Sequence, residues 1–127
     1  MEFNTIQNDK KLASYLKKTK CRLLISWHDF KKTPNKDQLR TRHSKMRKFS
    51  DMVKIVTMAK NVSDASRLLS LYSVKSKNKT IAFCMGEQGK FSRILCLHLG
   101  SPFTYVSLGK AIAAGQFSVD EIKSLQN

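Results

Sequence analysis

Two short segments of the sequence each carry one side chain that could do chemistry, and both begin with the composition of a β-strand. Residues 25–34 contain His28 and residues 52–59 contain Lys54. A lysine inside an apolar, β-branched run is partly desolvated, and desolvation lowers its pKa because it disfavours the ammonium form. A neutral lysine amine can attack a carbonyl group, and a histidine can move protons near neutral pH.

Each of these side chains also has a simpler interpretation. His28 could be a histidine that caps the loop after a strand, and Lys54 could extend its amine to solvent past the end of the strand. Lysines are rare in strand interiors unless they are paired or functional. We therefore favour a reactive role for both residues, because they occur together.

The elements that must position these residues follow from hydrophobic periodicity. Strands that are almost continuously apolar alternate with amphipathic helices, and this pattern is typical of a parallel sheet covered by helices. The sequence predicts one helix followed by four βα units in a single domain over residues 1–127. The expected helices are 5–20, 35–49, 63–74, 91–99 and 118–126, and the expected strands are 22–27, 52–58, 80–85 and 103–108.

The formal net charge of +15 is unusual for an enzyme that acts on a small molecule. Clustered lysine and arginine attract nucleic acid, but no zinc finger, RNP aromatic pair or GXXG loop accompanies them. We favour solvated helix faces as the interpretation, and an acidic partner segment is a further possibility.

Other classes of site receive little support from the sequence. Cys21, Cys84 and Cys96 lack the close pairing of a zinc ribbon or a redox dithiol, and we expect reduced structural thiols. His43 and His98 have no companion at metal-ligand spacing, so no metal site is predicted. No segment resembles a signal peptide or a membrane span, and a cytoplasmic protein is expected.

Four separated motifs, at residues 25–34, 52–59, 85–93 and 109–116, resemble the second half of type I 3-dehydroquinate dehydratases. They occur in the family's order and at nearly its spacing, within a resemblance that runs from about Arg22 to about Leu125. The resemblance implies half of an eight-stranded (β/α)8 TIM barrel. It also implies conversion of 3-dehydroquinate to 3-dehydroshikimate in the shikimate pathway, without cofactor or metal.

The resemblance assigns roles to individual residues of this chain. Lys54 would form an imine with the substrate ketone, and His28 would act as general base and then general acid. Arg93 would bind the substrate carboxylate, and Gln116 would hydrogen-bond substrate oxygens from a closing loop. Met85 and Tyr105 would line the pocket. The last motif differs from the family's pattern at two positions: Ile112 occupies the position of a common serine, and Ala114 occupies the position of a proline.

An eight-stranded barrel needs about 250 residues, so four βα units make half of one. An open half would leave two sheet edges and an inner face uncovered. A second copy, a separate first-half polypeptide or an open flavodoxin-like rearrangement could cover them. The family's second acidic catalytic residue is expected to come from the absent half, so the isolated chain should be weak or inactive. The alternatives to an enzyme are a non-catalytic half-barrel module and a basic nucleic-acid-binding domain.

Overall fold

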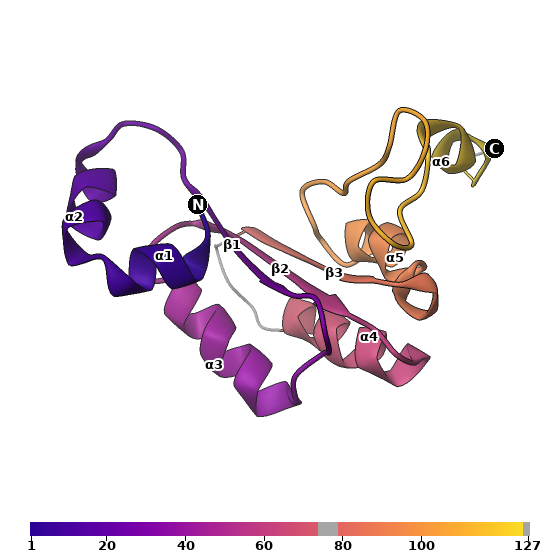
Figure 1. The fold of residues 1–127 in the computed structure, drawn as a ribbon, viewed down its shortest axis with the longest axis horizontal. Helices are drawn as coiled ribbons and strands as arrows, with labels where there is room; N and C mark the ends of the chain where they lie inside the picture. The colour runs from indigo at the N-terminus through magenta and orange to yellow at the C-terminus, as the bar shows by residue number, and fades with distance from the viewer. Residues whose placement is uncertain (74–78, 126–127) are drawn as a thin grey trace.

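The computed structural model describes residues 1–73 and 79–125 and contains a parallel sheet flanked by helices (Figure 1). The strands and helices alternate after an N-terminal helix pair. In chain order the elements are α1 (Phe3–Asn8), α2 (Lys10–Lys18), β1 (Leu24–Asp29), α3 (Lys36–Met46), β2 (Met52–Met58), α4 (Val62–Leu69), the 3-10 helix η1 (Ser70–Ser73), β3 (Lys79–Met85), the 3-10 helix η2 (Glu87–Gly89), α5 (Ser92–His98) and α6 (Val119–Leu125).

The three strands form a parallel sheet in the order β1, β2, β3. The expected strand over 52–58 is confirmed, and those over 22–27 and 80–85 are confirmed with shifts of one or two residues at their ends. The register pairs Ser26 with Lys54 and Lys54 with Ile81. Parallel pairing of consecutive strands is what the βα pattern predicts, because each helix carries the chain back to the start of the next strand.

The two faces of the sheet have different covers. Ile25, Val53 and Ile55 are fully buried in a core with Leu39 of α3 and Leu68 of α4. Figure 1 shows α3 and α4 together on this side of the sheet. The opposite face, called here the inner face, carries Ser26, His28, Lys54, Val56, Ile81 and Phe83 at alternating positions.

Side-chain caps fix where several helices begin. The Asn35 side chain accepts a hydrogen bond from Gln38 N, and Gln38 returns one to Asn35 N, which completes a capping box. The expected capping box of Ser118 and Glu121 is confirmed at the start of α6.

The single helix expected over residues 5–20 is wrong, because the chain forms two helices there. Asp9 has an extended backbone, and its carboxylate accepts a hydrogen bond from Leu12 N at 2.9 Å. Aspartate competes with the helical backbone in this way, so it ends α1 and caps α2. The helix expected over 63–74 ends as η1 at Ser73, and Val74 and Gln126 lie outside the described residues.

The fourth strand expected over residues 103–108 is also wrong: the described sheet has three strands. Ser101 Oγ donates to Phe103 O at 2.8 Å, and Ser107 Oγ donates to Gly109 O at 2.9 Å. The Ser107 backbone pairs with the segment around Ser118 instead of β3. Local side-chain bonds of this kind compete with a sheet ladder. The apolar composition of the segment reflects aromatic packing, described below, rather than strand pairing.

No described helix is long and apolar enough to cross a membrane.

His43 joins α3 to β3 and makes stability depend on pH. Its side chain is 2% exposed, and its Nε2 lies 2.8 Å from Thr80 Oγ1. Burial, with a further contribution from Arg47, lowers the pKa of His43 to about 4. Since the unfolded chain binds this proton at an ordinary histidine pKa, stability should fall as the pH drops from about 6.5 towards 4, by up to about 3 kcal/mol.

Urea unfolding of the wild-type chain and His43→Gln between these pH values tests the assignment. The free energy of unfolding of the variant should change less over the window. Exposed His98 provides the matched control, and His98→Gln should keep the wild-type slope. Equal slopes for His43→Gln and the wild type would contradict the role of His43.

Candidate active site

Lys54 and His28 lie on the inner face of adjacent strands. Lys54 is the third residue of β2, and its register partner on β1 is Ser26, two residues before His28. Two residues along a strand return to the same face, and neighbouring strands are about 4.8 Å apart. The two side chains are therefore diagonal neighbours, as the alternation of both strands predicts.

The Lys54 amine is half-buried under an aromatic ring. Its Nζ lies 4.1 Å from the centre of the Tyr105 ring, and Tyr105 packs against Phe83 and Phe103 at centroid distances of 6.0 and 5.6 Å. Burial is the largest cause that lowers the pKa of Lys54, the Arg93 charge lowers it further, and the Glu2 charge opposes both. The result favours a neutral amine more than at a surface lysine.

Glu2 supplies a carboxylate partner for His28 that sequence reasoning missed. Glu2 Oε2 lies 3.1 Å from His28 Nδ1 and 3.3 Å from Ser26 Oγ. Residues 1 and 2 run parallel to the edge of β1, with Ser26 N donating to Met1 O at 2.8 Å. An acidic partner for His28 is thus present in this chain, and the expectation that the family's acidic catalytic residue comes from an absent half stays a prediction. The one signal in the sequence is a carboxylate between Met1 and Phe3, and that signal is weak.

The carboxylate of Glu2 also selects how His28 can act. With Glu2 ionised, Nδ1–H donates to Oε2, and Nε2 keeps its lone pair available to accept a proton. A carboxylate that orients a histidine in this way is a recurring feature of acid–base sites. The ring of Phe30 stacks on His28 at a centroid distance of 5.8 Å and further restricts it.

Arg93, in the first turn of α5, brings a buried guanidinium to the same region. Arg93 is 2% exposed, its Cζ atom lies 4.6 Å from the centre of the Phe83 ring, and one terminal nitrogen donates to Ala114 O at 3.5 Å. Its Nε finds no hydrogen-bond partner among the described residues. Burial lowers the pKa of Arg93 as the largest cause. A buried guanidinium with an unused donor is suited to an incoming anion.

Gln116 belongs to a loop that folds over the end of β3. Its Oε1 accepts hydrogen bonds from Ile112 N at 3.0 Å and Ala113 N at 3.3 Å, so the amide oxygen holds the loop together. Ala114 O accepts from Gly86 N at 3.1 Å, directly after β3. Ile112 is 93% exposed and contributes little to packing. Met85 is buried in the inner-face cluster that also contains Phe83 and contacts Tyr105.

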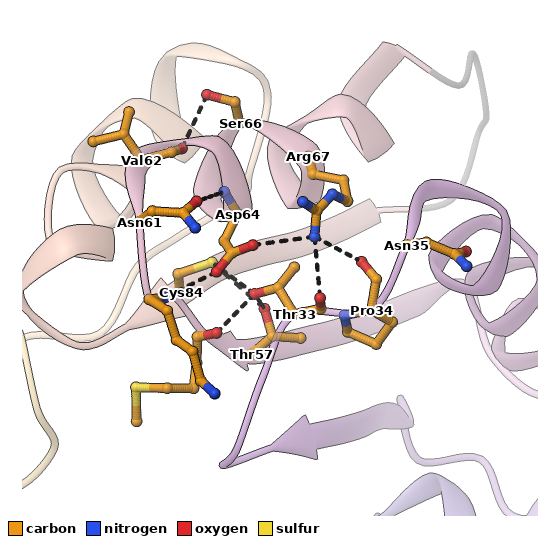
Figure 2. Close-up of polar contacts among 12 residues, drawn as sticks. Thr33, Pro34, Asn35, Thr57, Asn61, Val62, Asp64, Ser66, Arg67 and Cys84 are labelled. Atoms are coloured by element: carbon orange, nitrogen blue, oxygen red, sulfur yellow. Dashed lines mark hydrogen bonds and ion pairs between the residues drawn. The ribbon is translucent and has the colours of Figure 1, made fainter.

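A buried polar cluster behind the sheet anchors the loop that follows His28 (Figure 2). Thr33 Oγ1 lies 2.8 Å from Thr57 Oγ1 and donates to Met58 O at 2.9 Å. The Arg67 guanidinium donates to Thr33 O and to the Asp64 carboxylate, each at 3.1 Å. These bonds tie residues 33–34 to the carboxyl end of β2 and to α4, and so fix the loop between His28 and α3.

Metal chemistry has no candidate site in the part of the chain that the structure describes, where no three His, Cys, Asp or Glu side chains gather. Cys84 and Cys96 are buried free thiols, and burial raises the pKa of each. Both thiols are therefore poor nucleophiles.

A parallel α/β sheet with a lysine inside one strand and a histidine near the carboxyl end of the neighbouring strand fits a barrel-type protein. The chain belongs to the type I 3-dehydroquinase family, whose model matches residues 1–127. It is 47% identical over 103 residues to a 3-dehydroquinate dehydratase of Pyrobaculum aerophilum, covering 81% of this chain and 34% of the relative. It is 41% identical over 108 residues to one of Methanococcus maripaludis, covering 84% and 49%.

Solved structures agree with this assignment. The 3-dehydroquinate dehydratase from Aquifex aeolicus superposes with a TM-score of 0.81 at 31% identity and covers 99% of this chain and 57% of its own. The type I enzyme from Clostridium difficile, solved with covalent modified comenic acid, gives 0.83 at 26% identity, covering 98% and 52%. The chain thus spans about a third to a half of the curated relatives and about half of the solved ones. The half-barrel fold is confirmed, with three described strands.

The loop that carries Gln116 should depend on Gly115. Gly115 has φ +72°, and a Cβ there would lie 2.5 Å from Gly86 O. Gly115→Ala should open the contact between Ala114 O and Gly86 N, because alanine tolerates neither this φ nor this approach. We expect the Gly86 amide to exchange its hydrogen at least about ten times faster, corresponding to a loss of about 1.4 kcal/mol.

Gly109→Ala is the matched control for this measurement. Gly109 lies in the same region, and a Cβ there meets nothing within 4 Å. In the Gly109→Ala variant, the Gly86 amide hydrogen should exchange at the wild-type rate. An unchanged exchange rate of the Gly86 amide in Gly115→Ala would show that Gly115 is not needed for the contact between Ala114 O and Gly86 N.

Proposed function

We propose that this chain carries the reacting half of a type I 3-dehydroquinate dehydratase, which converts 3-dehydroquinate to 3-dehydroshikimate and water. The observation that carries the proposal is the half-buried Lys54 amine, with a lowered pKa, on the same face as the His28–Glu2 pair. A nucleophilic amine beside an oriented base is what elimination through an imine requires.

The reaction begins with attack of Lys54 Nζ on the substrate ketone. Loss of water from the carbinolamine gives a protonated imine, which withdraws electrons from the adjacent carbon. His28 Nε2 takes the proton from that carbon, and the electron pair moves to the imine nitrogen to form an enamine. The enamine then expels the hydroxyl group, which leaves as water with the proton from His28. Hydrolysis of the resulting imine returns the Lys54 amine and releases the product.

The remaining residues bind and orient the substrate. The substrate carboxylate pairs with the Arg93 guanidinium, whose buried Nε otherwise lacks a partner among the described residues. The Gln116 amide nitrogen serves as the donor to substrate oxygens, since its Oε1 is engaged by the loop. Met85 and Tyr105 form an apolar wall, and the Tyr105 ring keeps water from Lys54. Glu2 orients His28 and stabilises its charged form after proton transfer.

We infer that a complementary first half completes the barrel. The described sheet leaves the outer edge of β3 without a paired strand, and β1 pairs on its outer side only with residues 1 and 2. Strand edges and an apolar inner face are stable when covered. A complementary first half is favoured over a second copy, because each copy carries a net charge of +15.

Intact mass spectrometry after incubation with 3-dehydroquinate and borohydride tests the chemistry. Borohydride reduces an imine to a stable amine, so the wild-type chain should gain the mass of the reduced substrate adduct. Lys54→Ala should lose the adduct completely. Lys32→Ala is the matched control, because Lys32 is an exposed lysine on the loop after His28, and it should retain the adduct.

Native mass spectra of the same samples identify the assembly that forms the adduct. An adduct only in the presence of an added first-half polypeptide would support completion by a complementary chain, whereas an adduct on a homodimer would support self-association. If the folded chain formed no adduct in any assembly, the proposed dehydratase activity would be contradicted. The non-catalytic half-barrel module would then be the remaining interpretation.

A further inference from the structure

The solvent-facing side of α2 carries an exposed tyrosine between lysines. Lys11, Tyr15 and Lys18 follow one another at helical spacing, and the Tyr15 side chain is 67% exposed. The opposite side of α2 packs Ala13 and Leu16 against the core. Packing therefore does not explain the exposed ring, and burying it against another surface would be favourable.

A basic groove continues from this face at the end of α2. It has a volume of about 740 Å³ and lies where α2 meets the amino ends of the strands. Four cationic side chains line it, against the single carboxylate of Asp51; the four are Lys17, Lys20, Arg22 and Lys79. A volume of this size admits a group as large as a nucleotide.

None of the four groove cations forms an ion pair with a carboxylate among the described residues. The ion pairs that the structure gives for residues 1–73 and 79–125 are His28–Glu2, Arg67–Asp64 and Lys90–Glu121, all away from α2. α2 itself contains four lysines and no acidic residue. Concentrated positive charge of this kind attracts a partner with regularly spaced negative charges.

We propose that the basic groove and the outer face of α2 bind single-stranded nucleic acid. The lysines and arginine would contact successive phosphates, and the Tyr15 ring would stack on a base. An exposed aromatic ring on a cationic surface is the arrangement that binds unpaired strands, because every base offers a face for stacking. An acidic polypeptide matches the charge but leaves Tyr15 without a role.

This surface is separate from the candidate active site. The groove lies at the amino ends of the strands, whereas His28 and the loop after β3 lie towards their carboxyl ends. Figure 1 shows α2 at the opposite end of the molecule from α5 and α6. The proposal does not depend on the dehydratase, and variants of the surface should leave borohydride trapping unchanged.

Fluorescence anisotropy with labelled oligothymidylate, a duplex of equal length and polyglutamate tests the partner class. The single strand should bind most tightly. Contact with about four phosphates predicts a log–log salt slope of about −2.8, and hence about 50-fold weaker binding between about 50 and 200 mM salt. Equal affinity for the duplex, tighter binding of polyglutamate, or no binding at the lower salt would each overturn the proposal.

Two variants separate stacking from charge. Tyr15→Ala should weaken single-strand binding roughly ten-fold at an unchanged salt slope, because one stacked base is lost. Lys17→Ala combined with Lys20→Ala should reduce the slope by about 1.4, because both lysines line the groove and each would contact one phosphate.

Lys36→Ala combined with Lys123→Ala is the charge-matched control, since both lysines are exposed, one at the start of α3 and the other in α6, and neither lines the groove. It should change affinity less than about two-fold. Wild-type affinity in Tyr15→Ala, or equal losses in the two lysine pairs, would show non-specific attraction to the whole charged chain and overturn the assigned surface. Circular dichroism of each variant confirms that it is folded.

Discussion

The parallel register of β1, β2 and β3 is the constraint on which the candidate site depends. It places Lys54 between Ser26 and Ile81 on the inner face and brings His28 alongside. A register shift of one residue would turn Lys54 into the helix-covered core and Ile55 onto the inner face. The buried contacts of Ile25, Val53 and Ile55 with α3 and α4 forbid that shift. The packing of the sheet against α3 and α4 thus determines which side chains lie on the inner face.

The incomplete barrel explains how the site is covered. With three strands described, the segment 103–117 closes over the inner face through side chains rather than as a strand, and Tyr105 shields the Lys54 amine. On the other side, Glu2 reaches the inner face from the residues that pair with the edge of β1. Tyr105 and Glu2 thus reach the inner face from segments outside the three-stranded sheet. The surroundings of Lys54 and the orientation of His28 therefore depend on segments beside the outer strands of the described sheet.

The sequence predicted the parts of the fold that rest on periodicity. Continuous apolar runs identified β1, β2 and β3, and alternation along β2 placed Lys54 on one face with Met52 and Val56. Prediction from periodicity failed where local polar side chains compete with regular secondary structure. Asp9 breaks the N-terminal helix. The Ser101 hydroxyl donates to Phe103 O, and the Ser107 backbone pairs with Ser118, so backbone groups of the expected fourth strand are used elsewhere. Glu2 was missed because its contact with His28 spans 26 residues of chain, a separation that no local pattern reports.

The site depends most directly on Lys54, which the sheet holds as a partly desolvated amine beside Arg93. Burial and the Arg93 charge lower the pKa of Lys54, whereas the Glu2 charge raises it. The most direct measurement is a titration of Lys54 by NMR, with carbon-13-labelled lysine and Lys54→Ala to assign the signal. The pKa of Lys54 should lie below that of the surface lysines, and Glu2→Gln should lower it further, because the Glu2 charge raises it. A Lys54 signal that titrates together with the surface lysines would contradict the account, since the amine would then be solvated and charged at neutral pH.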